Sequence, residues 1–420
     1  MRTRRSRITL GLLTLIATLL VLPSAEAAPN WPAWRGPDNN GVAPEGNPPT
    51  EWSETSNIKW KVPLAGSGQS TPVIWGEKMF ILAASPTDGD GEYTFDVVCL
   101  NRNDGSTLWR KTAAREKPQE GHHPTGSFAP YSAITDGTYV WAGFGSRGLH
   151  CYDLDGNHQW STPLMKMSTR RGFGEGSSPV IAGDAIVVVQ DHEGPSRIGA
   201  YDKKTGTLLW EKDREEVTSW SSPYAVTMDG VTQVIVNATN RIRSYSAATG
   251  DLIWECGGMT TNVIPTPVSG FGMAYCTSGF RGAALTAIDL KSKGDVTGSP
   301  AWNIAENTPY VPSPLLYGER LYYLEGMNPK LSCVNAKSGE LLFSKISLED
   351  LGRVYASPVG AGGYVYVADR DGMVAVLTDS DSPKVVATNK LDDGFDASPV
   401  VVGDTLYLKG NTHLYCIAKS

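Results

Sequence analysis

Two short segments carry residue types that bind metal ions. Asp191-His192-Glu193 offers two carboxylates and an imidazole, and His122-His123 offers two more imidazoles. These side chains ligate zinc, but nothing in the sequence fixes the distances between them. A third segment, Asp88-Gly-Asp90-Gly-Glu92, alternates carboxylates with glycine as calcium loops do, and we interpret it as the cap of a long hairpin. We therefore predict no metal site.

Catalytic patterns are missing as well. The chain has no GxSxG elbow and no Ser-His-Asp order, so hydrolysis has no support. The stretch Arg171-Gly-Phe-Gly-Glu-Gly176 is rich in glycine, but no helix is expected after it, so it does not predict a phosphate loop. We predict no catalytic residue from the sequence.

Polar, charged and aromatic residues gather instead in two sets of loops within the repeat described below. One set precedes the first strand of each repeat and the other joins its second and third strands, so both sets should emerge on one face. Two interpretations stay open: loops that are polar because they face water, or a surface that binds a ligand or partner at a channel mouth. The candidate binding residues are His122, His123, Arg170, Arg171, Glu175, Asp191, His192, Trp220, Arg241, Arg281, Tyr310, Glu325, Arg353, Asp369, Arg370 and Asp396.

The composition limits the fold that presents these loops. Among 420 residues there are 45 Gly and 27 Pro, and only 19% are charged. Glycine enrichment argues against a helical bundle, and the 12 Trp and 17 Tyr argue against disorder. The formal net charge of −7 argues against nucleic-acid binding. A turn-rich, all-β protein is the remaining class.

A repeat confirms that class at the level of the sequence. A small residue, then Pro, then an apolar run recurs eight times, at intervals of 41 to 58 residues between the prolines. Each copy continues as short alternating strands separated by Gly or Asn turns, which predicts antiparallel hairpins. The eight prolines are Pro72, Pro130, Pro179, Pro223, Pro267, Pro314, Pro358 and Pro399.

Four short strands per repeat are typical of a β-propeller blade. The last copy lacks its fourth strand because the sequence given stops at Ser420, and a matching strand, residues 57–62, precedes the first copy. We therefore predict an eight-bladed β-propeller of four-stranded antiparallel blades, with its ring closed by this N-terminal strand. Residues 28–420 should form this single domain, with 28–57 as a segment leading into the closing strand.

Each repeat also carries a turn followed by a tryptophan. An Asp or Asn suited to an Asx-turn precedes a Gly suited to positive φ, and the Trp that follows should lie against the neighbouring blade. We expect a structural docking role for Trp60, Trp109, Trp160, Trp210, Trp254 and Trp302.

The six cysteines divide into two groups. Cys99, Cys151, Cys333 and Cys416 occupy the same small, buried position of four different repeats, so they should be too far apart to pair. Cys256 and Cys276 lie outside this pattern, and a disulfide between them stays open.

The first 27 residues read as an export signal. Four arginines precede an apolar run from Leu10 to Leu22, and Ala25-Glu26-Ala27 is a small-x-small cleavage site. We predict a cleaved signal peptide, a periplasmic or secreted protein and no transmembrane span. The choice between the general and the twin-arginine export route stays open.

The turn and tryptophan carry a family resemblance. Ala200 to Trp210 resembles the tryptophan-docking motif of the pyrroloquinoline quinone (PQQ)-like repeat family, and Ser244 to Trp254 is a looser copy. The segment Trp31 to Gly41 is similar to the start of many exported propellers of this kind. The family includes PQQ-dependent dehydrogenases and non-enzymatic propellers such as the assembly lipoprotein BamB.

The resemblance implies one of three functions. The dehydrogenases use adjacent disulfide-bonded cysteines, a calcium site and extra length, none of which this sequence shows, so no cofactor is predicted. We expect a monomeric, non-catalytic binding or assembly module of the cell envelope that binds an envelope protein or small ligand at its funnel. The alternatives are a divergent quinoprotein dehydrogenase with PQQ and calcium, acting on alcohols or aldose sugars, and a carbohydrate-binding propeller.

Overall fold

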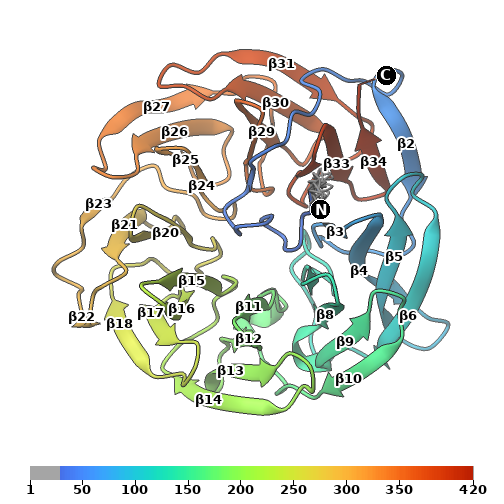
Figure 1. Cartoon of the computed structure of the whole chain (residues 1–420), viewed down its shortest axis with the longest axis horizontal. Coiled ribbons are helices and arrows are strands. Elements are labelled where there is room, and N and C mark those ends of the chain that lie inside the picture. Colours follow the sequence, from blue (N-terminus) through green and yellow to red (C-terminus); the bar gives the residue numbers. More distant parts are fainter. Residues whose placement is uncertain (1–28, 420) are drawn as a thin grey trace, which may run out of the picture.

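The computed structural model describes residues 29–419 and shows eight β-sheets arranged around a central axis (Figure 1). The predicted signal peptide, residues 1–27, lies entirely outside the described residues. Each sheet is built on four antiparallel strands in sequence order, apart from the closing blade. The eight-bladed propeller expected from the sequence is thus confirmed.

The first four blades follow the chain from blue to yellow in Figure 1. Blade 1 contains β3 (Val73–Trp75), β4 (Lys78–Pro86), β5 (Tyr93–Asn101) and β6 (Thr107–Glu116). Blade 2 contains β7 (Ile134–Thr135), β8 (Tyr139–Gly143), β9 (Leu149–Asp153) and β10 (His158–Thr162). Blade 3 contains β11 (Val180–Ala182), β12 (Ala185–Gln190), β13 (Ser196–Asp202) and β14 (Leu208–Arg214). Blade 4 contains β15 (Tyr224–Met228), β16 (Val231–Val236), β17 (Ile242–Ser246) and β18 (Leu252–Cys256), with β22 (Gly294–Asp295) parallel to β18.

The remaining blades complete the ring. Blade 5 contains β19 (Val268–Gly270), β20 (Met273–Ser278), β21 (Ala284–Asp289) and β23 (Trp302–Ile304). Blade 6 contains β24 (Leu315–Tyr317), β25 (Arg320–Leu324), β26 (Lys330–Asn335) and β27 (Leu341–Ser347). Blade 7 contains β28 (Val359–Ala361), β29 (Tyr364–Ala368), β30 (Met373–Thr378) and β31 (Val385–Lys390), with β1 (Val42–Ala43) parallel to β28. Blade 8 contains β32 (Val400–Val402), β33 (Thr405–Lys409), β34 (His413–Ile417) and β2 (Ile58–Pro63). Two short 3-10 turns, Gly145–Arg147 and Arg170–Gly172, lie in loops.

Blade 8 closes the ring as the sequence predicts. The N-terminal strand β2 pairs antiparallel with β34, which places the two ends of the propeller in one sheet (Figure 1). Apolar side chains of the inner strands are buried between neighbouring sheets, and one such core joins Tyr366 of blade 7 to Tyr407 of blade 8. Closure leaves no blade at an open end of the ring, where an unpaired sheet would invite aggregation.

The tryptophans dock as expected, with two variations in their hydrogen bonding. Trp60, Trp109, Trp210 and Trp302 each donate Nε1–H to a carbonyl in the turn of the next blade. Trp254 donates instead to Gln233 Oε1, and the amide of Gln233 donates to the Leu290 carbonyl of blade 5.

Trp160 shows the second variation. Its Nε1 has no partner in the part of the chain that the structure describes, and Trp141 donates to the expected carbonyl, that of Lys203. The ring of Trp160 nevertheless lies over Gly206 in the turn of blade 3. Docking therefore depends on ring contact as well as on the N–H bond.

The predicted repeat marker of blade 2, Ala129-Pro130, lies three residues before the observed one. The position equivalent to Ser-Pro elsewhere is Ser132-Ala133, directly before β7, and not Ala129-Pro130. Ala133 stands where the other blades have Pro, and Pro130 lies close enough in the sequence to be taken for it. The hydroxyl of Ser132 is the feature that the repeat retains.

Gly206 should be far less tolerant of a side chain than Gly183. Both have positive φ, +71° and +65°, but a Cβ on Gly206 would lie 2.4 Å from Cε3 of Trp160, whereas a Cβ on Gly183 meets nothing within 4 Å. We expect Gly183→Ala to lower the free energy of unfolding by about 1 kcal/mol through backbone strain alone. Gly206→Ala should lower it by about 1–2 kcal/mol more, because the ring must move. Urea denaturation of both variants tests this, and equal losses would contradict docking by ring contact.

Candidate functional site

The inner strands enclose a cavity of about 930 Å³ on the channel axis. The loops before the first strand of each blade supply most of its lining. Nine of the sixteen candidate binding residues line it: His123, Arg170, Arg171, Glu175, Trp220, Arg281, Tyr310, Arg353 and Asp396. These residues come from loops that are up to 273 positions apart in the chain, and the ring brings them to one surface.

A ring of eight hydroxyl groups forms the inner wall of this cavity. The backbone N–H that precedes each first strand donates to the Ser or Thr hydroxyl at the same position of the next blade, at 2.9–3.1 Å. The last bond, from Ser398 to Thr71, closes the circle. The ring consists of Thr71, Ser132, Ser178, Ser222, Thr266, Ser313, Ser357 and Ser398, all of which line the cavity. We call it the hydroxyl ring.

The segment from Trp31 to Ala43 is drawn in blue near the centre of Figure 1, where it passes across the channel. It contacts the far ends of the innermost strands: Trp31 exchanges backbone hydrogen bonds with Ile74, and Val42 pairs with Gly360. Trp34, in the middle of the segment, lines the cavity. The segment therefore forms the closed end of the channel.

Arg35 carries a positive charge into this closed end. It is 1% exposed, and its guanidinium donates to the carbonyls of Pro314 (2.8 Å) and Pro358 (2.9 Å), which directly follow two members of the hydroxyl ring. Within residues 29–419 it forms no ion pair, and its Nε–H has no acceptor. Burial lowers the pKa of Arg35 to about 9, which still leaves it charged at neutral pH.

The arginines of the cavity wall also lack acidic partners. Among the described residues, no ion pair involves Arg170, Arg171, Arg281 or Arg353. Arg170 donates to the Asn262 side-chain oxygen at 3.2 Å, and the guanidinium of Arg281 lies 5.4 Å from the ring centre of Phe280. These four charges are free to attract an anion.

The two carboxylates of the wall are, in contrast, already neutralised. Asp396 accepts two hydrogen bonds from Arg370, at 2.6 and 3.2 Å. Glu175 accepts from Tyr131 (2.7 Å) and from the backbone of Ser146 (2.7 Å), and it lies 3.7 Å from Arg147. The cavity is therefore cationic overall.

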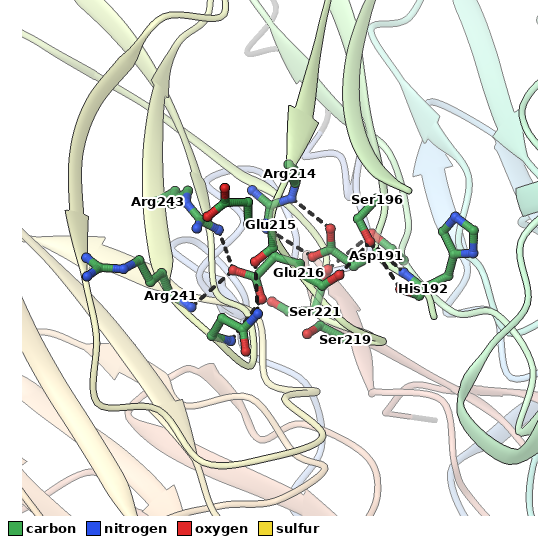
Figure 2. Close-up of polar contacts among 12 residues, drawn as sticks. Asp191, His192, Ser196, Arg214, Glu215, Glu216, Ser219, Ser221, Arg241 and Arg243 are labelled. Carbon is green, nitrogen blue, oxygen red and sulfur yellow. Dashed lines mark hydrogen bonds and ion pairs between the residues drawn. The ribbon is translucent and has the colours of Figure 1, made fainter. Parts of the chain in front are cut away.

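Three candidate residues lie outside the cavity lining in a network of polar contacts, in which Asp191 and His192 are buried and Arg241 is partly exposed (Figure 2). Asp191 forms a two-pronged ion pair with Arg214, at 2.7 and 2.9 Å, and the two side chains are 1% and 0% exposed. The Nδ1 of His192 accepts from the backbone N–H of Ser168 and Gly194, which occupies the lone pair that a metal would need. Arg241 pairs with Asp295 at 2.9 Å, near the outer edge.

The same network holds the connection from blade 3 to blade 4. Glu216 accepts from the backbone N–H of Asn240 and Arg241 and pairs with Arg243 (Figure 2). Two residues further on, the Thr218 hydroxyl accepts from the backbone N–H of Arg170 at 2.9 Å. The buried charges thereby fix the loop that carries Trp220 to the cavity.

The other four candidates also lie outside the cavity. Asp369 is fully buried and accepts from the backbone N–H of Gly352, Asp371 and Met373. Arg370 supports the wall through Asp396 and stacks over Tyr355. Glu325 lies 3.5 Å from Lys330 and from Lys345. His122 packs edge-on against Phe128 and bonds to the His123 carbonyl. These four residues belong to the predicted loops, but they are not part of the cavity lining.

Sequence reasoning missed three parts of the site. It did not assign the hydroxyl ring, although the Ser-Pro and Thr-Pro pairs were visible, because they were taken only as strand markers. It did not place Arg35 or Trp34 at the channel, although their segment was noted for its resemblance. It also missed the stacked pair of Phe280 and Tyr310, whose ring centres are 4.8 Å apart at the cavity.

The residues present do not fit the calcium site of the dehydrogenases. Glu175 and Asp396, the two carboxylates lining the cavity, already have guanidinium or N–H and O–H partners, and calcium needs several free oxygen ligands. Within the described residues, no three His, Cys, Asp or Glu side chains form a group that could hold a metal ion. All six cysteines are free in the structure, Cys256 and Cys276 included.

These features define an eight-bladed, tryptophan-docked propeller with a channel closed at one end and a cationic cavity at the other. The family model described as outer membrane protein assembly factor BamB matches residues 45–194, 93–293 and 194–420. These matches span most of the sequence, and the chain belongs to this family of PQQ-like propellers.

Individual relatives are distant. BamB from Yersinia pestis is 22% identical over 329 residues, which make up 75% of this chain and 78% of that protein. The crystal structure of BamB from Moraxella catarrhalis superimposes with a TM-score of 0.58 at 16% identity, covering 85% of this chain and 98% of that one. A europium-containing methanol dehydrogenase gives a TM-score of 0.65 at 12% identity, covering 94% and 98%. At such identities the structural likeness shows the fold alone.

Proposed function

We propose that this protein is an exported, non-catalytic binding module of the cell envelope that receives a protein partner at its central cavity. The observation that carries the proposal is the group of four wall arginines without acidic partners around a cavity whose far end is crossed by the segment Trp31 to Ala43. Unpaired guanidiniums attract carboxylates and hold them with paired hydrogen bonds. Membership of a family named for an assembly factor supports a protein as the partner.

Localisation forms part of the same proposal. The Arg-rich start, apolar run and cleavage site of residues 1–27 support export. In the part of the chain with described structure, no helix is long and apolar enough to cross a membrane. Envelope fractionation and mass spectrometry of the native N-terminus would test this, with cleavage expected near Ala28.

Charge reversal at the cavity should abolish capture of the partner. We expect the triple variant Arg170→Glu, Arg171→Glu and Arg281→Glu to retain less than a tenth of the protein that co-purifies with the wild type from envelope extracts, because three attractive charges become repulsive. Quantitative mass spectrometry after affinity capture measures this.

The matched control reverses three exposed lysines on the outside of the ring. Lys59, Lys111 and Lys293 form no ion pairs in the described structure, so their change to Glu alters net charge equally but not the cavity. Unchanged capture by the cavity variant would refute the proposal. So would dye-linked oxidation of alcohols or aldose sugars after addition of PQQ and calcium, which would support the quinoprotein alternative.

A further inference from the structure

The closed end of the channel limits what can enter the cavity. The segment Trp31 to Ala43 spans the far ends of the inner strands, and Trp34 faces the cavity from that side. A polypeptide can therefore enter from the open mouth but cannot pass through. An occupant of this site is the end of a chain or a compact group, and not the middle of an extended one.

The hydroxyl ring supplies hydrogen-bond donors at this depth. Each hydroxyl oxygen accepts one backbone N–H from the preceding blade, so its own proton remains to be donated. Among residues 29–419, each of the eight hydroxyls takes part as an acceptor of this N–H bond, and none donates a hydrogen bond to another residue. A ring of unused O–H donors facing a cavity suits an oxyanion.

The positive charge around the cavity also favours an oxyanion as the ligand. Arg35 lies directly behind the hydroxyl ring, bonded to the carbonyls of Pro314 and Pro358, and has no anionic partner there. Burying a lone cation is costly unless an anion compensates it. The wall arginines add four charges nearer the mouth, and Glu175 and Asp396 add none that is free. Positive charge thus extends from the mouth to the closed end.

We propose that the cavity binds the acidic C-terminal end of a protein partner. The terminal carboxylate would lie against the hydroxyl ring, within the field of Arg35, and Asp or Glu side chains just before it would pair with Arg170, Arg281 and Arg353. This inference rests on the proposed function, since it names the part of the partner that is recognised. The proposed binding mode requires a free C-terminus on the partner. Simple attraction between charged surfaces would not require one.

The test is a peptide titration with the full mature chain. The probe is a fluorescein-labelled peptide, Gly-Ser-Gly-Asp-Glu-Asp-Glu, with a free carboxyl end, measured by fluorescence anisotropy. We expect the C-terminal amide to bind at least threefold more weakly and the Asn/Gln version at least tenfold more weakly. Equal binding of the free acid and the amide would overturn the assignment of the carboxylate to the closed end.

Substitutions of cavity residues test whether the peptide binds in the cavity. Arg281→Gln and Arg353→Gln should each weaken peptide binding about tenfold, and Lys111→Gln, on the outer strand β6, should leave it unchanged. Arg35→Met should weaken the free acid more than the amide. If that variant does not fold, the two wall variants decide the outcome. Binding that survives both wall changes would overturn the proposal.

Two further measurements distinguish failure of this inference from failure of the proposed function. Binding of a heparin tetrasaccharide, with no binding of the acidic peptide, would overturn the inference in favour of an anionic glycan. Capture of an envelope protein that is lost on charge reversal, with no binding of the peptide, would leave the proposed function standing and refute the C-terminal assignment alone.

Discussion

Replacing Asp191 with Asn should lower the free energy of unfolding by about 3–5 kcal/mol. Asp191 and Arg214 are 1% and 0% exposed and share two hydrogen bonds (Figure 2). Loss of the carboxylate charge leaves the guanidinium hydrogen-bonded to a neutral amide and to the Tyr245 hydroxyl. The other carboxylate nearby, Glu216, is already paired with Arg243. Removing one partner of a buried pair is costly mainly because the other charge stays uncompensated.

Chemical denaturation monitored by tryptophan fluorescence measures the loss. The matched control is Asp251→Asn, which breaks the pair with Lys212 on the outer surface, where the two side chains are 71% and 40% exposed. That change should cost at most about 1 kcal/mol, because water screens an exposed pair. Equal effects at the two sites would contradict the assignment of Asp191 to a buried ion pair.

A double replacement separates charge from packing. Asp191→Asn combined with Arg214→Met removes both charges and keeps much of the volume, so it should recover a large part of the stability lost by the single variant. The connection from Arg214 to Trp220 reaches the cavity through the bond from Arg170 to Thr218. The single variant should therefore also weaken ligand binding at neutral pH, although Asp191 does not touch the cavity.

The fold was predictable from the sequence because its signals are local. Asp202, Gly206 and Trp210 act within one turn and one strand: Asp202 accepts from the N–H groups of Lys204 and Thr205, and Gly206 has positive φ. Such a unit repeats with its spacing intact, so counting its copies gives the number of blades. The prediction is wrong in blade 2, where Ala133 stands in the place of the marker Pro.

The site was only partly predictable, because the direction in which a loop side chain points depends on partners that are distant in the sequence. Arg170 and Asp191 lie in loops on the same face of blade 3, yet one side chain lines the cavity and the other lies behind its wall. The difference comes from Arg214, 23 residues after Asp191, which turns the carboxylate inward. Arg35 is a similar case, since two of its three carbonyl partners are 279 and 323 residues away. Only the closed ring brings these groups together.

Lys409 should make the protein more stable as the pH rises from about 8 to about 10.5. Its side chain is buried, its ammonium donates to the Gly68 carbonyl, and the carboxylates facing it, Asp393 and Asp396, offset only part of the cost of burial. Burial lowers the pKa of Lys409 from 10.5 to about 8. Between these values the unfolded chain holds a proton that the native chain has released, so stability increases with pH, by about 3 kcal/mol over the window.

The effect of Lys409 is measured as the difference in the free energy of unfolding between wild type and Lys409→Met at each pH. Buried tyrosines, whose pKa values are raised, make stability fall above pH 10 in both proteins, so their contribution cancels. From pH 7.5 to pH 10.5, the free energy of unfolding of the wild type should rise by about 3 kcal/mol relative to the variant, measured by urea denaturation. The exposed Lys111, changed to Met, should give no such trend. A constant difference between wild type and Lys409→Met would mean that Lys409 keeps its ordinary pKa, and that the surrounding wall is more hydrated or more acidic than its contacts indicate.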